Sequence, residues 1–285
     1  MPRLLFLLFI GISAASSASI LIKLCDAPAL IISTYRMVFA SLMLLPFAYH
    51  QKVWKDWGRS GIRWLAVSGV FLSLHFAFWI SSLKYTSVAS SVVLVSTHPV
   101  FVGIGSWLFL KEHVGIKLIL GIVLSILGSA LISLGDMSLA KGALVGDGLA
   151  LLGAITAAGY FLVGRKMRKG QDLLSYIFPV YSTSAIALVL LALLWENPFF
   201  GYSSSNYLLF FLLALIPQLI GHTAFNWALK YIPASLVAIT VLGEPVGSTI
   251  LAFFILGEGL TPWKILGGIS IFLGILIALW RDNPG

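Results

Sequence analysis

The sequence is short of charged residues, which make up only 10% of its 285 residues. Soluble globular proteins carry about 25% charged residues, because their surfaces face water. The shortage runs along the whole chain, while 59% of the residues are hydrophobic and the mean hydropathy is +1.02. No stretch remains that would form a separate soluble domain. We therefore predict an all-α integral membrane protein, with residues 1–285 as a single membrane domain.

Cysteine and the common catalytic motifs are also scarce. Cys25 is the only cysteine, which rules out an internal disulfide and disfavours a cysteine-rich metal site. The sequence contains no phosphate-binding Gly-rich loop ending in Lys-Ser/Thr, so the chain does not hydrolyse ATP itself. It also lacks the HExxH and GxSxG motifs of hydrolases. His75, His98, His222 and Glu244 show no metal-ligand spacing. We expect no enzyme activity, cofactor or metal.

Long apolar runs dominate what is present. A membrane-spanning helix needs roughly 20 mainly apolar residues, and these runs are far too long for the strands of a barrel. We predict ten transmembrane helices, at about 4–22, 28–49, 63–83, 87–110, 116–134, 144–164, 172–195, 206–229, 232–256 and 263–280.

The basic residues predict the orientation. The net charge is +8, but the cations lie between apolar runs rather than along one polar face, so we expect no nucleic-acid partner. Lys and Arg gather on the cytoplasmic side of membrane proteins. With a cytoplasmic N-terminus, Lys23, Lys84, Lys141 and Lys264 fall outside, Arg36 lies within a helix, and the other basic residues fall inside. This predicts a multi-pass protein of the plasma (inner) membrane with both termini cytoplasmic.

An internal repeat organises the chain. Leu83-Lys84-Tyr85 matches Leu229-Lys230-Tyr231 at a shift of 146 residues, since 229 − 83 = 146. The same shift pairs Pro99 with Pro245 and Gly128 with Gly274. We predict a first repeat at about 1–138 and a second at about 142–285, with five helices each. Because five is odd, the second repeat enters from the opposite side and the repeats are inverted, an arrangement that places substrate sites near the bilayer midplane.

Several short motifs recur in order in both halves and cover essentially the full chain. They are Ala-Leu-Lys-Tyr-Ile-Pro-Ala-Ser (228–235), Gly-Glu-Pro-Val (243–246), Leu-Gly-Glu (256–258), Leu-Gly-Gly-Ile (266–269), Leu-Lys-Tyr-Thr-Ser-Val-Ala-Ser (83–90), His-Pro-Val (98–100) and Leu-Lys-Glu (110–112). Together they resemble the EamA-type drug/metabolite transporters. The resemblance implies ten helices in two inverted repeats and secondary transport, often export of amino acids or related metabolites. It names no substrate. The first helix lacks the membrane-embedded Glu of the four-helix multidrug members, so their proton-coupling scheme does not transfer.

Glu244 and His98 are the candidates for coupling or gating. Glu244 is predicted mid-span, where a charge costs about 2.5–3.5 kcal/mol, directly before Pro245. Proline frees a carbonyl of the preceding turn, so a protonated Glu244 either donates to that carbonyl or couples transport to protons. His98 occupies the equivalent place before Pro99, since 98 + 146 = 244. It forms either a proton relay or gating pair with Glu244, or a neutral hydrogen-bonded histidine.

Further polar and aromatic residues are candidates for lining a cavity. Gln218, His222 and Asn226 follow at i, i+4 and i+8, which places them on one helical face. His75 and Trp79 share a face of the third helix, with His75 at nearly the depth of His222. Plain helix packing is the alternative for Trp79.

The second, sixth and seventh helices add four more candidates: Tyr35, Arg36, Tyr160 and Tyr181. Arg36 either snorkels to the interface or anchors a carboxylate. At the ends of two spans, Glu112 and Glu258 are interpreted as boundary or packing elements.

These observations favour a secondary transporter that exports amino acids or related small metabolites or drugs by alternating access, with proton coupling left open. The alternatives are a channel, a flippase-like carrier of lipids or drugs and, less favoured, an intramembrane enzyme. The sequence is compatible with a monomer and with a homodimer.

Overall fold

The computed structural model describes residues 2–83, 85–86, 88–134, 143–257 and 259–280, and every regular element within them is a helix. The predicted cations Lys84, Lys141 and Arg281, and Glu258, lie outside the described residues. The elements are α1 (Pro2–Lys23), α2 (Ala29–Gln51), the short 3-10 turn η1 (Val53–Asp56), α3 (Arg59–Ser82), α4 (Val88–Val95), α5 (His98–Leu110), α6 (Ile116–Leu134), α7 (Ala143–Arg168), α8 (Leu173–Leu194), α9 (Ser204–Leu213), the π-helix η2 (Ala214–His222), α10 (Thr223–Ala228), α11 (Ala234–Val241), α12 (Glu244–Leu256) and α13 (Pro262–Leu279).

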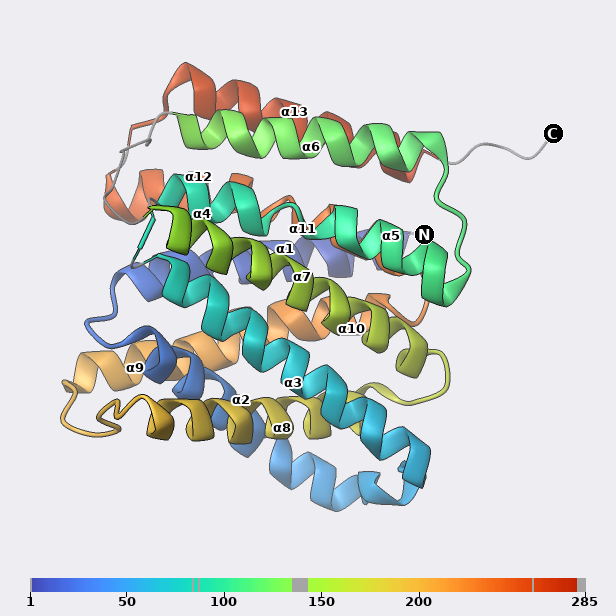
Figure 1. Cartoon of the computed structure of the whole chain (residues 1–285), viewed down its shortest axis with the longest axis vertical. Coiled ribbons are helices and arrows are strands. Elements are labelled where there is room, and N and C mark those ends of the chain that lie inside the picture. The colour runs from blue at the N-terminus through green and yellow to red at the C-terminus, as the bar shows by residue number, and fades with distance from the viewer. Residues whose placement is uncertain (1, 84, 87, 135–142, 258, 281–285) are drawn as a thin grey trace.

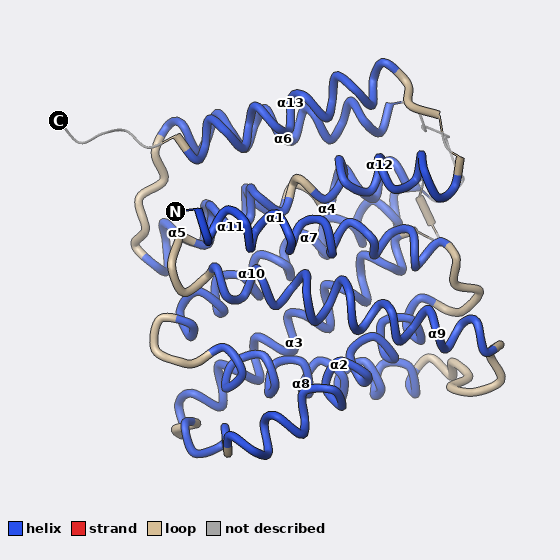
Figure 2. Tube along the Cα trace, turned by 180° about the vertical axis from the view of Figure 1, so that it is seen from behind, coloured by secondary structure: helices blue, strands red, loops and turns tan. Residues whose placement is uncertain are grey.

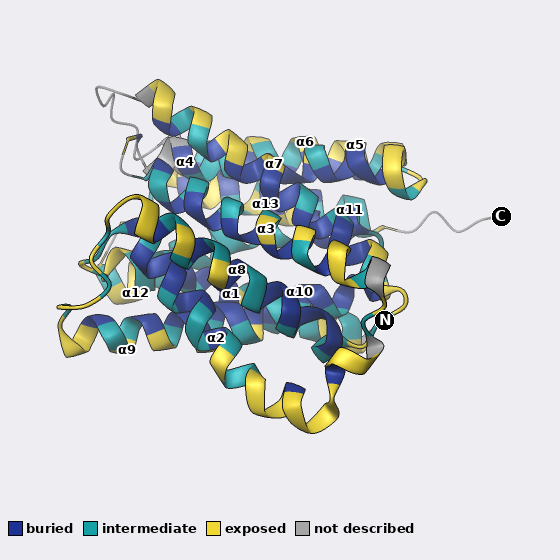
Figure 3. Ribbon diagram, turned by 60° about the horizontal axis from the view of Figure 1, so that its bottom comes forward, coloured by how far each residue is buried: buried dark blue, intermediate teal, exposed yellow. Residues whose placement is uncertain are grey.

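These elements form ten transmembrane spans, as predicted, because α4–α5, α9–η2–α10 and α11–α12 each make one span. Nine stretches of the described chain are long and apolar enough to cross a membrane, and the tenth, Ile116–Ile132, is a shorter apolar helix. The spans lie side by side in one bundle, and α1 begins at the end of the bundle where α13 finishes (Figure 1). Exposed residues occupy the outer faces and the loops (Figure 3), and many are large and apolar, such as Phe9, Phe109 and Phe254. A surface of this kind faces lipid.

Two spans are broken where the sequence predicts continuous helices. The breaks fall between α4 and α5 and between α11 and α12. Proline has no N–H and its ring clashes with the carbonyl four residues earlier, so each span stops and restarts with Pro99 or Pro245 in its first turn. All four bounds of α4 and α5 become those of α11 and α12 on adding 146 (88, 95, 98 and 110 become 234, 241, 244 and 256). The internal repeat therefore extends to the backbone breaks.

The eighth span also departs from the prediction of a plain α-helix. Residues Ala214–His222 form a π-helix that contains Pro217. Proline removes one backbone donor, and a π segment is one way in which the helix accommodates that loss. π-Helical segments are rare in proteins, and those that occur are often found at functional sites. This one carries Gln218 and His222, two of the predicted cavity residues.

The two repeats meet along α6 and α13, which lie alongside each other at one edge of the bundle (Figure 2). Glycines allow the close approach: a Cβ added at Gly128 would lie 2.6 Å from the carbonyl oxygen of Gly267, and one at Gly121 would lie 2.5 Å from that of Gly274. Ser125 Oγ donates to the carbonyl oxygen of Ile271, 3.4 Å away. Small residues commonly let membrane helices pack this closely.

Candidate functional site

Arg36 lies at the centre of a buried polar cluster. It is placed by α2 and is only 1% exposed, so it does not snorkel to the interface. Its Nε donates to Gln218 Oε1 at 2.9 Å, and its Cζ lies 4.2 Å from the centroid of the Phe76 ring. Nη1 and Nη2 have no hydrogen-bond partner among the described residues. The guanidinium is therefore anchored on one side and unpaired on the other.

Gln218, His222 and Asn226 turn inward from the eighth span. Gln218 and Asn226 are fully buried, and the His222 ring packs edge-on against Phe76 with ring centroids 5.5 Å apart. Gln218 Nε2 and His222 Nδ1 have no partner within the described part of the chain. The predicted polar stripe is thus brought together on one side of the span, in spite of the π-helix within it.

Tyr160 and Tyr181 join the eighth span through Asn226. Asn226 Nδ2 donates to the hydroxyl oxygens of Tyr160 at 2.6 Å and of Tyr181 at 3.2 Å. The Tyr181 hydroxyl also lies 3.2 Å from Thr223 Oγ1. All three of Tyr160, Tyr181 and Asn226 are buried. The network therefore ties α7, α8 and α10 together beside the Arg36 guanidinium.

His75 and Trp79 form an aromatic wall from α3. Their rings stack with centroids 5.9 Å apart and an interplanar angle of 10°, and His75 Nδ1 lies 2.9 Å from the carbonyl oxygen of Gly153. Phe76, which sequence reasoning did not single out, lies between His75 and the Arg36 guanidinium. Phe76 lies on a helix with several other aromatic residues, so nothing in the sequence distinguished it from a residue that only packs against its neighbours.

His98 and Glu244 occupy the first turns of α5 and α12. His98 Nδ1 lies 3.1 Å from the carbonyl oxygen of Val95, and its ring stacks on Phe161 at 5.9 Å. Glu244 is half-buried, and Arg36 is the charged group with which it interacts electrostatically. A relay between His98 and Glu244 stays a prediction.

Tyr35 is not part of this cluster, although it precedes Arg36 in the chain. Its ring stacks on Phe210 at 4.8 Å, and its hydroxyl donates to the carbonyl oxygen of Phe199 at 2.7 Å. It therefore packs against α9 and the link that precedes it.

A second polar network lies at the end of the bundle where α7 finishes with Arg165, Lys166 and Arg168, which we call the basic end. Arg165 Nε donates to Glu112 Oε1 at 2.7 Å, and its Nη1 donates to the carbonyl oxygen of Leu229, also at 2.7 Å. Glu112 Oε2 accepts the backbone N–H of Ala234 at 3.3 Å, and Lys169 Nζ lies 3.6 Å from Glu112 Oε1. We call these five residues the latch, because they connect the first repeat to the second. Glu112, interpreted from the sequence as a boundary or packing element, thus bonds to both the Arg165 side chain and the Ala234 backbone.

The latch is connected to the central cluster through Arg168. Arg168 Nε donates to the carbonyl oxygen of Asn226 at 3.0 Å, and its Nη1 donates to the carbonyl oxygen of Gln171. The side-chain amide of the same Asn226 holds Tyr160 and Tyr181. In the sequence, the basic residues between positions 165 and 169 predicted only that this end of the helix faces the cytoplasm, and they gave no sign of these hydrogen bonds.

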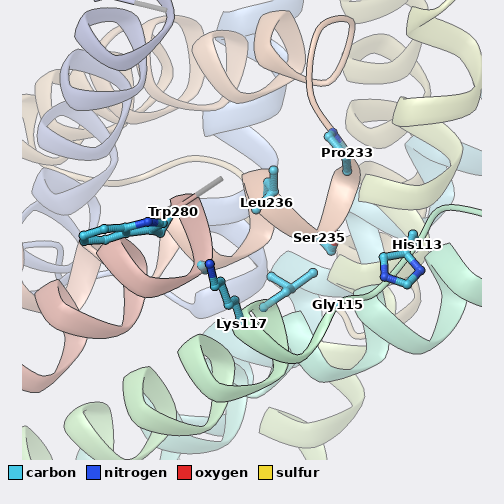
Figure 4. A pocket seen from close by; sticks show the side chains of 9 residues that line it. His113, Gly115, Lys117, Pro233, Ser235, Leu236 and Trp280 are labelled. Carbon is cyan, nitrogen blue, oxygen red and sulfur yellow. The ribbon is translucent and has the colours of Figure 1, made fainter. Parts of the chain in front are cut away.

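A cavity of about 170 Å³ lies beside the latch (Figure 4). None of its lining residues was predicted as a site residue. It is lined by His113, Gly115, Lys117, Leu118, Pro233, Ser235, Leu236, Ala278 and Trp280. His113 follows Glu112, and Pro233 and Ser235 flank Ala234, so this recess adjoins the groups that close the basic end.

Comparison with known proteins assigns this sequence to a family. The sequence model of the EamA-like transporter family matches residues 2–134 and 144–280, one match for each half. An uncharacterized transporter of Archaeoglobus fulgidus is 27% identical, with 93% of this chain and 92% of that protein covered. The uncharacterized transporter YdfC of Bacillus subtilis is 26% identical, with 88% and 82% covered.

A human protein and a solved structure are also similar to this chain. Human solute carrier family 35 member G1 is 26% identical, with 92% of this chain and 75% of that protein covered. A crystal structure of a protein with 16% identity superimposes with a TM-score of 0.78 and covers 98% of this chain and 97% of its own. At that identity the likeness concerns the fold alone.

Proposed function

Since this chain belongs to the EamA-like transporter family, it is a membrane transporter, and we propose that it moves amino acids or related small metabolites by alternating access. The observation that carries this proposal is the buried polar cluster around Arg36. Its members come from both repeats: Arg36 and Phe76 from the first, Gln218 and Asn226 from the second. Polar groups inside a membrane bundle are costly and mark solute pathways, and transporters of inverted repeats bind their substrates at the repeat interface.

Alternating access is supported by the backbone breaks and by the latch. The breaks before His98 and Glu244 give two symmetry-related spans the discontinuous form that is common at transporter sites. The latch joins the repeats through the Glu112 carboxylate, which accepts from the Arg165 side chain and from the backbone N–H of Ala234. We propose that it opens when the protein exposes the central cluster to that side.

We propose that the protein lies in the plasma membrane and that its basic end faces the cytoplasm. Arg165, Lys166 and Arg168 lie in the last turn of α7, and Lys169 follows directly. Positive residues gather on the cytoplasmic side. Because α1 begins and α13 ends at one end of the bundle (Figure 1), both termini would share that side. Export is the direction we propose, as the resemblance implies.

Counterflow in proteoliposomes tests this function. Vesicles loaded with a mixture of unlabelled amino acids are diluted, and uptake of each labelled amino acid is followed, with protein-free vesicles as the control. Saturable uptake that depends on the internal solute is expected for a carrier. Uptake proportional to concentration, together with ohmic conductance, would identify a channel and refute alternating access. Absence of uptake by folded protein would refute the amino-acid substrate and direct the assay to nucleosides and amines.

A further inference from the structure

The central cluster holds more hydrogen-bond donors than the described chain supplies acceptors for. Arg36 Nη1 and Nη2 and Gln218 Nε2 are buried without a partner, and the two residues are 1% and 0% exposed. They belong to one group, because Arg36 Nε and Gln218 Oε1 are 2.9 Å apart. Trp79 Nε1 is a further buried donor without a partner, on the aromatic wall. Nearly all buried polar groups in proteins are hydrogen-bonded, so this cluster calls for an acceptor from outside the chain.

Among the described residues, none neutralises the Arg36 guanidinium by direct contact. Within the described residues no carboxylate lies within 4.0 Å of the Arg36 guanidinium, whereas Glu112 pairs with Arg165 and Lys169 at the latch. Glu244 interacts with Arg36 electrostatically, without a direct bond. The single hydrogen bond to Gln218 orients the guanidinium and leaves its two outer nitrogens unpaired. A buried cation in this condition is strongly unfavourable unless a counter-charge binds to it.

We propose that the transported solute carries a carboxylate, which binds to Nη1 and Nη2 of Arg36 and accepts a further hydrogen bond from Gln218 Nε2. A planar guanidinium fork matches the two oxygens of a carboxylate. One guanidinium carries one positive charge, so a monocarboxylate balances it and a phosphate dianion would leave excess negative charge. This inference rests on the proposed function and deepens it, because amines, lipophilic cations and neutral nucleosides are then not substrates.

The surroundings of the fork define the rest of the solute. Phe76 covers one face of the guanidinium, and His75 and Trp79 continue the aromatic surface along α3. The His222 ring closes this side from the eighth span. An apolar or aromatic body attached to the carboxylate would pack against these rings, as in L-leucine, L-phenylalanine or 3-phenylpropionate.

Thermal unfolding of the purified full-length chain, followed by tryptophan fluorescence, tests the carboxylate without requiring transport. Each acid is compared with its own amide: L-leucine with L-leucinamide, L-phenylalanine with L-phenylalaninamide, and 3-phenylpropionate with its amide. We expect at least one acid to raise the unfolding temperature saturably, with its amide at least roughly 10-fold weaker, the factor that corresponds to losing hydrogen bonds to a charged group. Equal shifts from an acid and its amide, or no shift from any acid, would overturn the proposal.

Substitutions test whether the preference for the acid over its amide depends on Arg36. Arg36→Gln is expected to remove the preference for the acid, and Arg36→Lys, which keeps the charge without the fork, to weaken acid binding. Ser33→Ala is the matched control, because Ser33 is buried one turn earlier on α2 and, among the residues that the structure describes, its hydroxyl bonds only to the carbonyl oxygen of Ala29. Full acid preference in a folded Arg36→Gln would overturn the proposal; if that variant does not fold, the comparison of acid with amide on the unmodified protein still decides.

Failure of the two proposals can be told apart. Counterflow of amines in preference to acids would leave the transporter in place and refute the carboxylate. Acid binding that depends on Arg36, without counterflow of any solute, would support the carboxylate site and refute carrier function.

Discussion

The ion pair of the latch gives a prediction that can be tested by a double-mutant cycle. Arg165 Nε and Glu112 Oε1 are 2.7 Å apart, and their side chains are only 10% and 11% exposed. The pair joins Glu112, on the link after α5 in the first repeat, to Arg165 of α7 in the second repeat, and Arg165 Nη1 also donates to the carbonyl oxygen of Leu229. The perturbations are Glu112→Gln, which keeps an acceptor for Ala234 but removes the charge, Arg165→Gln, and the two together.

The expected coupling free energy lies between two known limits. Exposed ion pairs contribute about 0.2–1 kcal/mol, whereas removing one partner of a buried pair costs about 3–5 kcal/mol. Two unit charges 4 Å apart interact by about 4 kcal/mol at the effective dielectric constant of a protein surface, before desolvation is subtracted. With about a tenth of each side chain exposed, we expect a coupling of about 2 kcal/mol.

Unfolding by SDS in mixed micelles, followed by tryptophan fluorescence, measures the free energy for each member of the cycle. Lys169→Gln is the control, because Lys169 Nζ is 3.6 Å from the same carboxylate oxygen but its side chain is 53% exposed. It should cost less than about 0.5 kcal/mol. A coupling below about 0.5 kcal/mol, or a Lys169→Gln cost equal to that of Glu112→Gln, would show that the latch is an ordinary surface pair.

Three further predictions concern packing, a thiol and proton coupling. Gly128→Ala should lower the unfolding free energy by about 1–3 kcal/mol, because its Cβ would lie 2.6 Å from the carbonyl oxygen of Gly267, whereas Gly148→Ala, with open space around it, should be neutral. Burial raises the pKa of the Cys25 thiol to about 11, so the thiol is protonated at pH 7.5 and its labelling by a maleimide should be slow. The labelling rate should rise about tenfold for each pH unit of increase below that pKa, and it should also rise after unfolding in SDS. Rapid labelling of the folded protein at pH 7.5 would contradict this. Glu244→Gln should abolish pH dependence of uptake if protons are coupled through that carboxylate, and unchanged pH dependence in a folded variant would reject the role.

Much of the fold was predictable because membrane solvation acts on composition. A span needs a long apolar run whatever its packing, so the number of spans and their approximate ends follow from hydropathy. The shift of 146 residues was visible in matched pairs such as Pro99 and Pro245, and it recurs in the helix bounds. The backbone breaks were harder to predict, since hydropathy is continuous through them and prolines are tolerated within membrane helices when neighbours satisfy the freed groups.

The candidate site was only partly predictable because side-chain partners lie far apart in the sequence. Tyr35 and Arg36 are neighbours, yet successive residues on a helix point about 100° apart, and only Arg36 enters the central cluster. Helical spacing did identify Gln218 and Asn226, which share a side of one span. The latch was missed because the partner of Glu112 is Arg165, 53 positions away, and nothing local to either residue indicates the pair.

The scaffold is repeated but its charges are not, and this difference bears on the mechanism. His98 and Glu244 occupy matching first turns of α5 and α12, while the position of Arg36 in α2 falls close to that of Tyr181 in α8. The central cation therefore comes from the first repeat and its electrostatic partner Glu244 from the second. Under the proposed alternating access, a movement of one repeat against the other changes the separation of the Arg36 guanidinium and the Glu244 carboxyl group. A solute carboxylate bound to Arg36 would offset that change, so the energy of the transition depends on whether the site is loaded.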